Sequence, residues 1–148
     1  MINSLKFVIA LFIINIIHYN TISSSDAETS TIYLGSNNIV ELGEDTFRNL
    51  SSLIYLVLDF NYIEEIKEFT FRHLSSVQYL NLNGNNLKEI KLDTFRSLSR
   101  LRKLRLAENN IDKIQVGTFD DLPSLTYLNL RGNKIKEIEV ETFRNLST

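Results

Sequence analysis

The chain has 148 residues, enough for one domain, and 43% of them are hydrophobic while 23% are charged. This ordinary composition excludes wholesale disorder. A formal net charge of -2 excludes a general attraction to nucleic acid or anionic membranes, and the absence of cysteine excludes a disulfide framework and any thiolate metal site.

The N-terminal segment has the layout of a secretory signal peptide. Residues 1–6 carry one positive charge, and residues 7–17 form a run of 11 residues that is apolar except for one asparagine. The chain then turns polar, and residues 25–27 place small side chains at both key positions of a cleavage site. A spanning helix needs about 20 apolar residues, so an uncleaved membrane anchor is the weaker alternative. We expect residues 1–27 to be removed, with 23–25 as a rival cleavage site.

From residue 29 onward the chain superposes on itself at a shift of 24 residues, without insertion or deletion. This predicts a repeat domain over residues 28–148, made of the units 29–52, 53–76, 77–100, 101–124 and 125–148. Three ladders of identical residues recur at the constant spacing. They are Asn37, Asn61, Asn85, Asn109 and Asn133, then Phe47, Phe71, Phe95, Phe119 and Phe143, and finally Leu50, Leu74, Leu98, Leu122 and Leu146.

Each unit contains the pattern L-x-x-L-x-L-x-x-N-x-I-x-x-I, followed by the ladder phenylalanine and leucine. In the third unit Leu80 and Leu82 flank the polar Asn81, as expected of a half-buried strand. The spacings do not sustain an apolar helical stripe, which excludes a coiled coil or a helical bundle. A single unit buries too few apolar side chains to offset the backbone entropy of ordering it, so the units must stack.

We therefore predict an α/β repeat solenoid with one short strand per unit. The strands form a parallel sheet on the concave face, and short turns or helical segments form the convex side. The phenylalanines of successive units should come within the distance of about 4.5–7 Å at which aromatic rings attract. The ladder asparagines should be buried at a bend, where their amides satisfy backbone groups of adjacent turns.

The units resemble the typical extracellular leucine-rich repeats of Toll-type receptors, Slit-like proteins and small leucine-rich proteoglycans. The motif L-x-x-L-x-L-x-x-N-x-I-x-x-I-x-x-x-x-F-x-x-L is met in full or nearly so by every unit, over 120 of the 148 residues. The resemblance implies an extracellular binding module without specifying its ligand. Extracellular members usually carry cysteine-rich caps, and this chain has no cysteine. A fragment of a larger receptor and a complete short protein therefore both remain open.

The sequence contains no constellation that would support catalysis or hold a cofactor or a metal. After residue 27 it has one histidine, His73, and it has no Gly-rich phosphate loop. Gly84 and Gly132 each precede a ladder asparagine, where a turn is the natural interpretation. We expect no enzymatic activity, no cofactor and no metal.

The strongest binding signal lies on the predicted inner face. Strand alternation turns the leucines inward, so their neighbours face outward, and four of the six tyrosines are among these neighbours. Aromatic residues and arginine dominate binding hot spots, although tyrosine also favours strands for structural reasons. Phe60 is the least expected residue, since its equivalents are serine, glycine or glutamate. The predicted partner-binding residues are Tyr33, Tyr55, Val57, Asp59, Phe60, Tyr79, Asn81, Lys103, Arg105, Tyr127, Asn129 and Arg131.

The outer side offers two further features. Asn49 and Asn145 each begin an Asn-Leu-Ser glycosylation sequon on the predicted outer segments. An arginine recurs at one outer position and is preceded in the same unit by an acidic residue, which favours local ion pairs over a sulfated-glycan site. These arginines are Arg48, Arg72, Arg96 and Arg144.

Three functional hypotheses follow. The first is a secreted or cell-surface module, Toll-like or of matrix type, that binds a protein through its concave face. The second is a binder of a glycan or another polyanion through Arg100, Arg102, Lys103 and Arg105, with an affinity that falls steeply as salt is added. The third is a truncated gene product without a partner. We expect a protein partner, no nucleic acid, and no membrane span in this chain.

Overall fold

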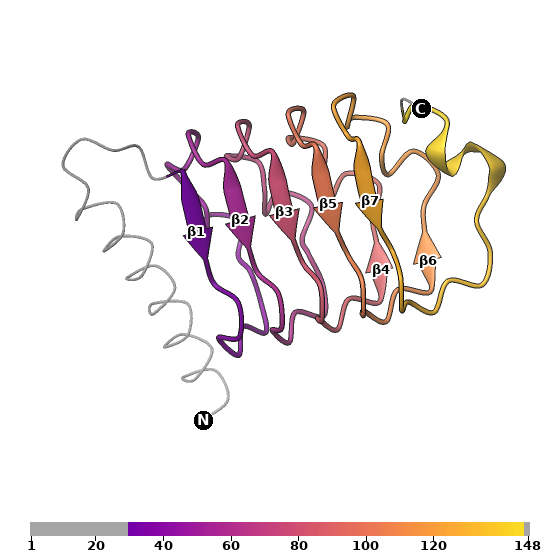
Figure 1. The fold of residues 1–148 in the computed structure, drawn as a ribbon, viewed down its shortest axis with the longest axis horizontal. Coiled ribbons are helices and arrows are strands. Elements are labelled where there is room, and N and C mark those ends of the chain that lie inside the picture. The colour runs from indigo at the N-terminus through magenta and orange to yellow at the C-terminus, as the bar shows by residue number, and fades with distance from the viewer. Residues whose placement is uncertain (1–29, 147–148) are drawn as a thin grey trace.

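The backbone reproduces the 24-residue repeat of the sequence. The structure, a computed structural model, describes residues 30–146, so the predicted signal peptide and the sequon residue Ser147 lie outside the described residues. The main strands begin 24 residues apart and lie side by side in a 5-stranded parallel sheet (Figure 1). In chain order they are β1 (Thr31–Tyr33), β2 (Tyr55–Val57), β3 (Tyr79–Asn81), β5 (Lys103–Arg105) and β7 (Tyr127–Asn129).

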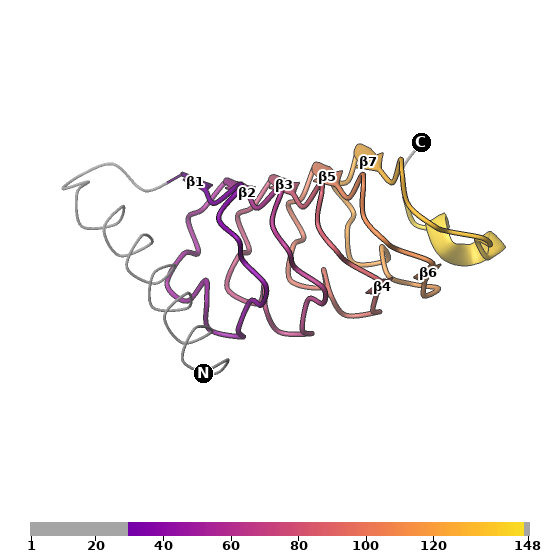
Figure 2. The same cartoon turned by 90° about the horizontal axis from the view of Figure 1, so that it is seen from below.

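The opposite side of the coil is built mainly from turns. Two short parallel strands, β4 (Glu89–Ile90) and β6 (Lys113–Ile114), pair there, away from the main sheet (Figure 2). Within residues 30–146 helical structure is limited to one 3-10 turn, η1 (Val140–Phe143). The predicted solenoid is confirmed, with the parallel sheet along its inner side and turns on its outer side.

The core is a stack of identical layers. The central residue of each of the strands β1, β2, β3 and β5 is completely buried, as the alternation predicted. The predicted aromatic ladder is also confirmed, because the rings of successive units stack nearly parallel along the outer side of the core. Their centroids are 5.9 Å apart for Phe47–Phe71, 6.3 Å for Phe71–Phe95, 6.4 Å for Phe95–Phe119 and 5.7 Å for Phe119–Phe143.

The ladder asparagines connect consecutive turns. The Nδ2 of Asn85 donates to the carbonyl of Leu58 in the preceding unit (3.0 Å) and to that of Leu82 in its own (3.1 Å). Its Oδ1 accepts a hydrogen bond from the backbone N–H of Ile63 (3.1 Å). Asn61 and Asn109 are buried with the same pattern of bonds. In these three units the prediction is confirmed, and the amide satisfies backbone groups that the stacking removes from water.

The prediction is wrong at the first rung, and Asn133 at the last rung is only half-buried. Asn37 is exposed, and its side chain donates only to Gly35 of its own turn among residues 30–146. The reason is that this amide reaches toward the preceding turn, which does not exist within the described residues for the first unit. Burial of an asparagine in this ladder thus depends on a neighbouring turn and not on the motif alone.

A second polar ladder was not predicted. The threonine before each ladder phenylalanine is buried in the later units, with 0–2% of its surface exposed. Thr118 donates to the carbonyl of Gln115 (2.7 Å), while three of the other buried hydroxyls have no partner within the described residues. The Thr-Phe dipeptide recurs in every unit of the sequence and could have indicated these buried threonines. These residues are Thr70, Thr94, Thr118 and Thr142.

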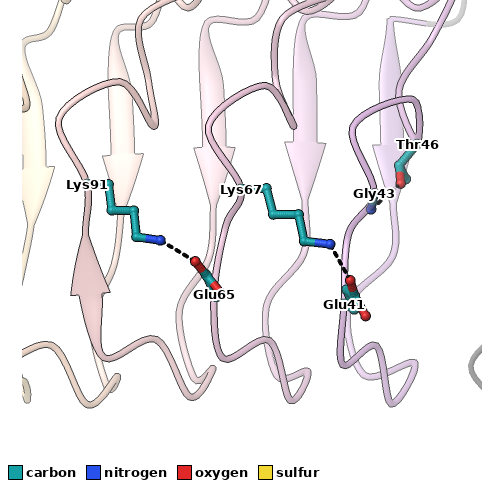
Figure 3. Close-up of polar contacts among 6 residues, drawn as sticks. All are labelled: Glu41, Gly43, Thr46, Glu65, Lys67 and Lys91. Atoms are coloured by element: carbon teal, nitrogen blue, oxygen red, sulfur yellow. Dashed lines mark hydrogen bonds and ion pairs between the residues drawn. The ribbon is translucent and has the colours of Figure 1, made fainter.

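Exposed ion pairs join consecutive turns along one edge of the solenoid (Figure 3). The Nζ of Lys67 lies 2.6 Å from Glu41, and Lys91 forms the equivalent pair with Glu65 one turn later. Each lysine side chain points toward the glutamate of the neighbouring turn, 26 residues earlier in the chain. Because these groups are open to solvent, each pair contributes little to stability, and any larger effect comes from the repetition of the pairs along the solenoid.

The outer arginines pair between units as well as within them. The predicted local pairs are present for Arg96, 3.7 Å from Asp93, and for Arg144, 4.0 Å from Glu141. The shorter contacts, however, reach back to the preceding unit, from Arg72 to Asp45 (2.7 Å) and from Arg144 to Asp120 (2.6 Å). The local-pair interpretation was therefore incomplete, because stacking brings acidic residues of one turn beside arginines of the next.

We expect Asn85→Ala to lower the free energy of unfolding by more than about 2 kcal/mol, because it leaves the Leu58 carbonyl and the Ile63 N–H buried without a partner. Asn133→Ala should cost less, since Asn133 is half-buried and water can replace its bonds. Chemical denaturation of both variants measures the difference. Equal losses would show that the rungs do not depend on their neighbouring turns.

Acid should weaken the pairs between turns. The hydrogen bond from Lys91 lowers the pKa of Glu65 from its ordinary 4.5, and that from Arg72 lowers the pKa of Asp45 from 3.8. Stability from such carboxylates is fully present above the unfolded pKa and is lost as pH falls through the lowered folded pKa. We therefore expect the Tm, measured in low salt, to decrease as the pH is lowered from about 5.

The matched test is the double variant Glu65→Gln with Asp45→Asn, whose Tm should depend less on pH in this range than that of the unaltered chain. The exposed Asp121 supplies the control, and Asp121→Asn should keep the full pH dependence. Superimposable pH profiles for the double variant and the unaltered chain would contradict a role for these pairs.

Candidate binding surface

The inner face is formed by the first and third residues of each main strand. Register places these residues in two rows that run across the strands, because each residue pairs with the residue 24 positions later. The first row is Thr31, Tyr55, Tyr79, Lys103 and Tyr127, and the second is Tyr33, Val57, Asn81, Arg105 and Asn129.

The half of this face nearer the N-terminus is aromatic. Tyr33 is 74% exposed, and Tyr55 is 47% exposed with its ring 5.9 Å from that of Tyr79. Tyr127 is also exposed, but Lys103 separates it from Tyr79 in the row. The predicted tyrosine column is therefore one contacting pair and one isolated ring.

Phe60 combines an unfavourable backbone conformation with an exposed aromatic side chain. It adopts a left-handed backbone (φ 51°) and is 64% exposed, so burial does not offset a strain of about 1–2 kcal/mol. Its ring lies over Gly84, where a Cβ would come within 2.7 Å of the ring. Glu108 lies over Gly132 in the same way. Glycine is thus favoured at both positions by the positive φ, and the large side chain of the preceding unit leaves no room there for a Cβ.

Tyr62 is a candidate that the sequence analysis missed. It follows Phe60 by two residues in the same turn and is 54% exposed. Comparison of the units could have revealed it, because the equivalent positions of the other units hold asparagine or lysine. Two exposed aromatic side chains therefore lie on the turn after β2, next to the aromatic half of the inner face.

Asn81 was predicted to face a partner, and this is wrong. The residue is only 5% exposed, because Asp59 of the preceding unit covers it and accepts a hydrogen bond from its Nδ2 (3.0 Å). Its Oδ1 accepts the backbone N–H of Asn83 (3.1 Å), whose own side chain accepts the N–H of Ala107 (2.8 Å). These side chains form a polar network that braces the end of β3.

The half nearer the C-terminus is basic. Lys103 and Arg131 are exposed, and Arg105 is half-buried in the second row. The Nη1 of Arg105 donates to the Tyr79 hydroxyl (3.3 Å), and this hydrogen bond raises the pKa of Arg105, which stays charged. Its Nε is buried without a partner within the described residues. The inner face thus changes from aromatic to cationic across its width.

The asparagines of the two predicted glycosylation sequons lie away from the inner face. Asn49 and Asn145 are exposed on the outer side, and Asn49 has a left-handed backbone (φ 66°). Across residues 30–146 there is no cluster of acidic, histidine or cysteine side chains that could hold a metal. The helical structure in that range is too short and too polar to cross a membrane. The hollows between turns are lined by charged residues such as Glu65 and Lys88.

Proteins of known structure share this architecture. TLR13, solved in complex with ssRNA13, is 28% identical and superposes with a TM-score of 0.71, over 74% of this chain and 15% of that one. Internalin C2 of Listeria monocytogenes is 30% identical with a TM-score of 0.65, over 80% of this chain and 48% of that one. Toll, from the Drosophila Toll–Spätzle complex, is 24% identical and shares the fold with a TM-score of 0.72, over 76% of this chain and 16% of that one.

The chain thus spans less than half the length of each of these proteins. No curated protein sequence matches it. The model of the leucine rich repeat family, however, matches it over residues 27–87, 55–111, 79–135 and 99–148, which overlap to cover everything after the predicted signal peptide. The protein is a member of the leucine-rich-repeat family.

Proposed function

We propose that the protein is an extracellular recognition module that binds a protein partner through its inner face. The observation that carries the proposal is Phe60, an exposed aromatic side chain in a left-handed backbone on the turn after β2, which also carries the exposed Tyr62. Every unit takes a positive φ at this position, at Ser36, Gly84, Glu108 and Gly132, so the fold needs the conformation but does not need an aromatic side chain in it. Exposed aromatic side chains of this kind act as anchors in protein interfaces.

The dimensions of the face suit a protein partner. Strands spaced about 4.8 Å apart make a 5-stranded sheet roughly 19 Å across, so a standard footprint of around 800 Å² would cover the sheet and extend onto the adjoining turns. Its charge is mixed, with Asp59 and Glu108 near Arg105 and Arg131. An aromatic patch bordered by polar groups of both charges is common in protein interfaces.

A polyanion is the second candidate, and one observation favours it. Arg100, Arg102, Lys103 and Arg105 all come from one turn of the solenoid, and three of them are exposed. TLR13, which has a similar fold, was solved in complex with a polyanion, ssRNA13. The acidic residues on the same face oppose this candidate. Binding that weakens steeply with salt would favour the polyanion over the protein partner.

Secretion completes the proposal. It rests on the layout of residues 1–27 and on the sequon asparagines Asn49 and Asn145, which are both exposed on the outer side, away from the inner face. Glycans attached there would leave the proposed binding face uncovered.

Variants of the aromatic surface should separate binding from stability. We expect Tyr79→Ala to weaken binding of a captured partner by about 2 kcal/mol. Phe60→Gly should weaken it similarly while raising the free energy of unfolding by about 1 kcal/mol, because glycine relieves the left-handed strain. Titration calorimetry and denaturant melts measure the two effects.

Arg96→Ala is the matched control on the outer side and should leave affinity nearly unchanged. If Arg96→Ala abolishes binding while Tyr79→Ala and Phe60→Gly bind normally, the partner occupies the other side of the solenoid.

The full-length chain expressed in a secreting cell should be released without residues 1–27, because its apolar run is too short to anchor it. N-terminal sequencing of the medium should find a start near Glu28. Recovery of the intact N-terminus in the membrane fraction would overturn the signal-peptide assignment.

A further inference from the structure

Arg105 is a half-buried cation that forms no direct ion pair with any described residue, and the carboxylate of Asp59 acts on it only from beyond ion-pairing distance. Every other arginine of residues 30–146 is exposed, and the outer ones Arg72, Arg96 and Arg144 pair with carboxylates. Among the described residues no carboxylate lies within ion-pairing distance of Arg105, whose recorded bond is to the Tyr79 hydroxyl. The guanidinium is partly desolvated and its Nε is buried without a partner, so only its terminal nitrogens can meet a group that arrives from outside.

The side chain next to Arg105 in the row has a free donor as well. Asn129 on β7 pairs in register with Arg105, so the two side chains share the inner face on adjacent strands. The Oδ1 of Asn129 accepts the backbone N–H of Arg131 (3.0 Å), which orients its Nδ2 away from that bond. No acceptor for this Nδ2 lies among the described residues.

Asn81, the residue equivalent to Asn129 two units earlier, has the acceptor that Asn129 lacks. Asn81 accepts the N–H of Asn83 through Oδ1 and donates from Nδ2 to the carboxylate of Asp59, 22 residues earlier. The residue 22 positions before Asn129 is Ala107, which has no carboxylate. The protein therefore satisfies the amide of Asn81 with its own acid and leaves the equivalent amide of Asn129 open, beside the unpaired Arg105.

We infer that Arg105 and Asn129 form a seat for a single carboxylate of the protein partner, from an acidic side chain or a chain terminus. The inference rests on the proposed function and deepens it by naming a group that the partner must present. Carboxylate bonds from a charged guanidinium and an amide are among the stronger polar contacts in an interface. The aromatic rings of Tyr79 and Tyr127 on either side of Lys103 favour an apolar neighbour for that carboxylate.

A pair of small probes tests the seat without the partner. The mature domain labelled with ¹⁵N is titrated with 3-phenylpropionate and with its neutral isostere 3-phenylpropanamide. We expect the propionate to shift the signals of Arg105 Nε–H and Asn129 Nδ2, and the amide to bind at least about tenfold more weakly. Arg105→Gln should weaken propionate binding at least about tenfold, whereas Lys103→Gln, on the same strand, should change it less than about threefold. Equal responses to the two probes would overturn the inference.

A substitution at Ala107 tests the same idea in the free protein. Ala107→Asp should supply the missing acid from within the chain, as Asp59 does for Asn81, and should abolish propionate binding. Ala107→Asn has the same size without the charge and serves as the control for crowding at this buried position. We expect the Asp variant to melt at a higher temperature than the Asn variant at low salt, and the difference to shrink at 1 M salt. A lower or equal Tm for the Asp variant would contradict the seat.

The outcomes separate this inference from the proposed function. If propionate does not bind but partner binding still depends on Tyr79 and Phe60, the seat is wrong and the recognition face stands. If propionate binds at Arg105 and the partner ignores the aromatic residues, the face is wrong and the seat stands. A heparin or oligothymidylate probe that binds more than about tenfold tighter than propionate, and that needs Arg100 and Arg102 as well, would replace the protein carboxylate with a polyanion.

Discussion

The amide of the ladder asparagine is the interaction on which the rest of this structure depends. Each repeat bends sharply after its strand, and the bend leaves backbone carbonyls and N–H groups facing the interior. The asparagine of one turn bonds to its own bend and to that of the preceding turn, as Asn85 does to Leu82 and Leu58. The same amide therefore stabilises the bend of its own turn and sets the distance to the neighbouring turn, because it bonds to backbone groups of both turns. The phenylalanine stack on the other side of the core repeats the same spacing with apolar contacts.

Because separate residues form the core and the inner face, the residues of the inner face can vary without disrupting the fold. The leucines, the asparagines and the phenylalanines hold the coil together, so the first and third residues of the strands, apart from the buried Asn81, lie outside the core. Their variation from unit to unit has no counterpart in the core ladders, where the same residue type recurs. A change at Tyr55 or Lys103 alters what the protein presents to a partner while the stack beneath it is preserved.

The inner face is nevertheless not a set of independent positions. Asp59 reaches Asn81, Asn83 reaches Ala107, and Arg105 reaches Tyr79, in each case between neighbouring units. Phe60 occupies the space that Gly84 leaves open. The part of a side chain that one turn exposes to solvent thus depends on the turn beside it.

The sequence by itself determined the repeat length, the parallel solenoid, the buried leucines and the stacked phenylalanines, because these follow from the periodicity of apolar residues and from the inability of one unit to fold alone. It also identified Phe60 as unusual. Only the tertiary structure decided that Asn37 is exposed, that Asn81 is covered by Asp59, and that Arg72 pairs with the preceding unit. Alternation along a strand predicts the direction of a side chain, but its burial and its partner depend on residues 22 to 27 positions away that stacking brings alongside. That pairing between turns is set by the rise and twist of the coil, which no single repeat encodes.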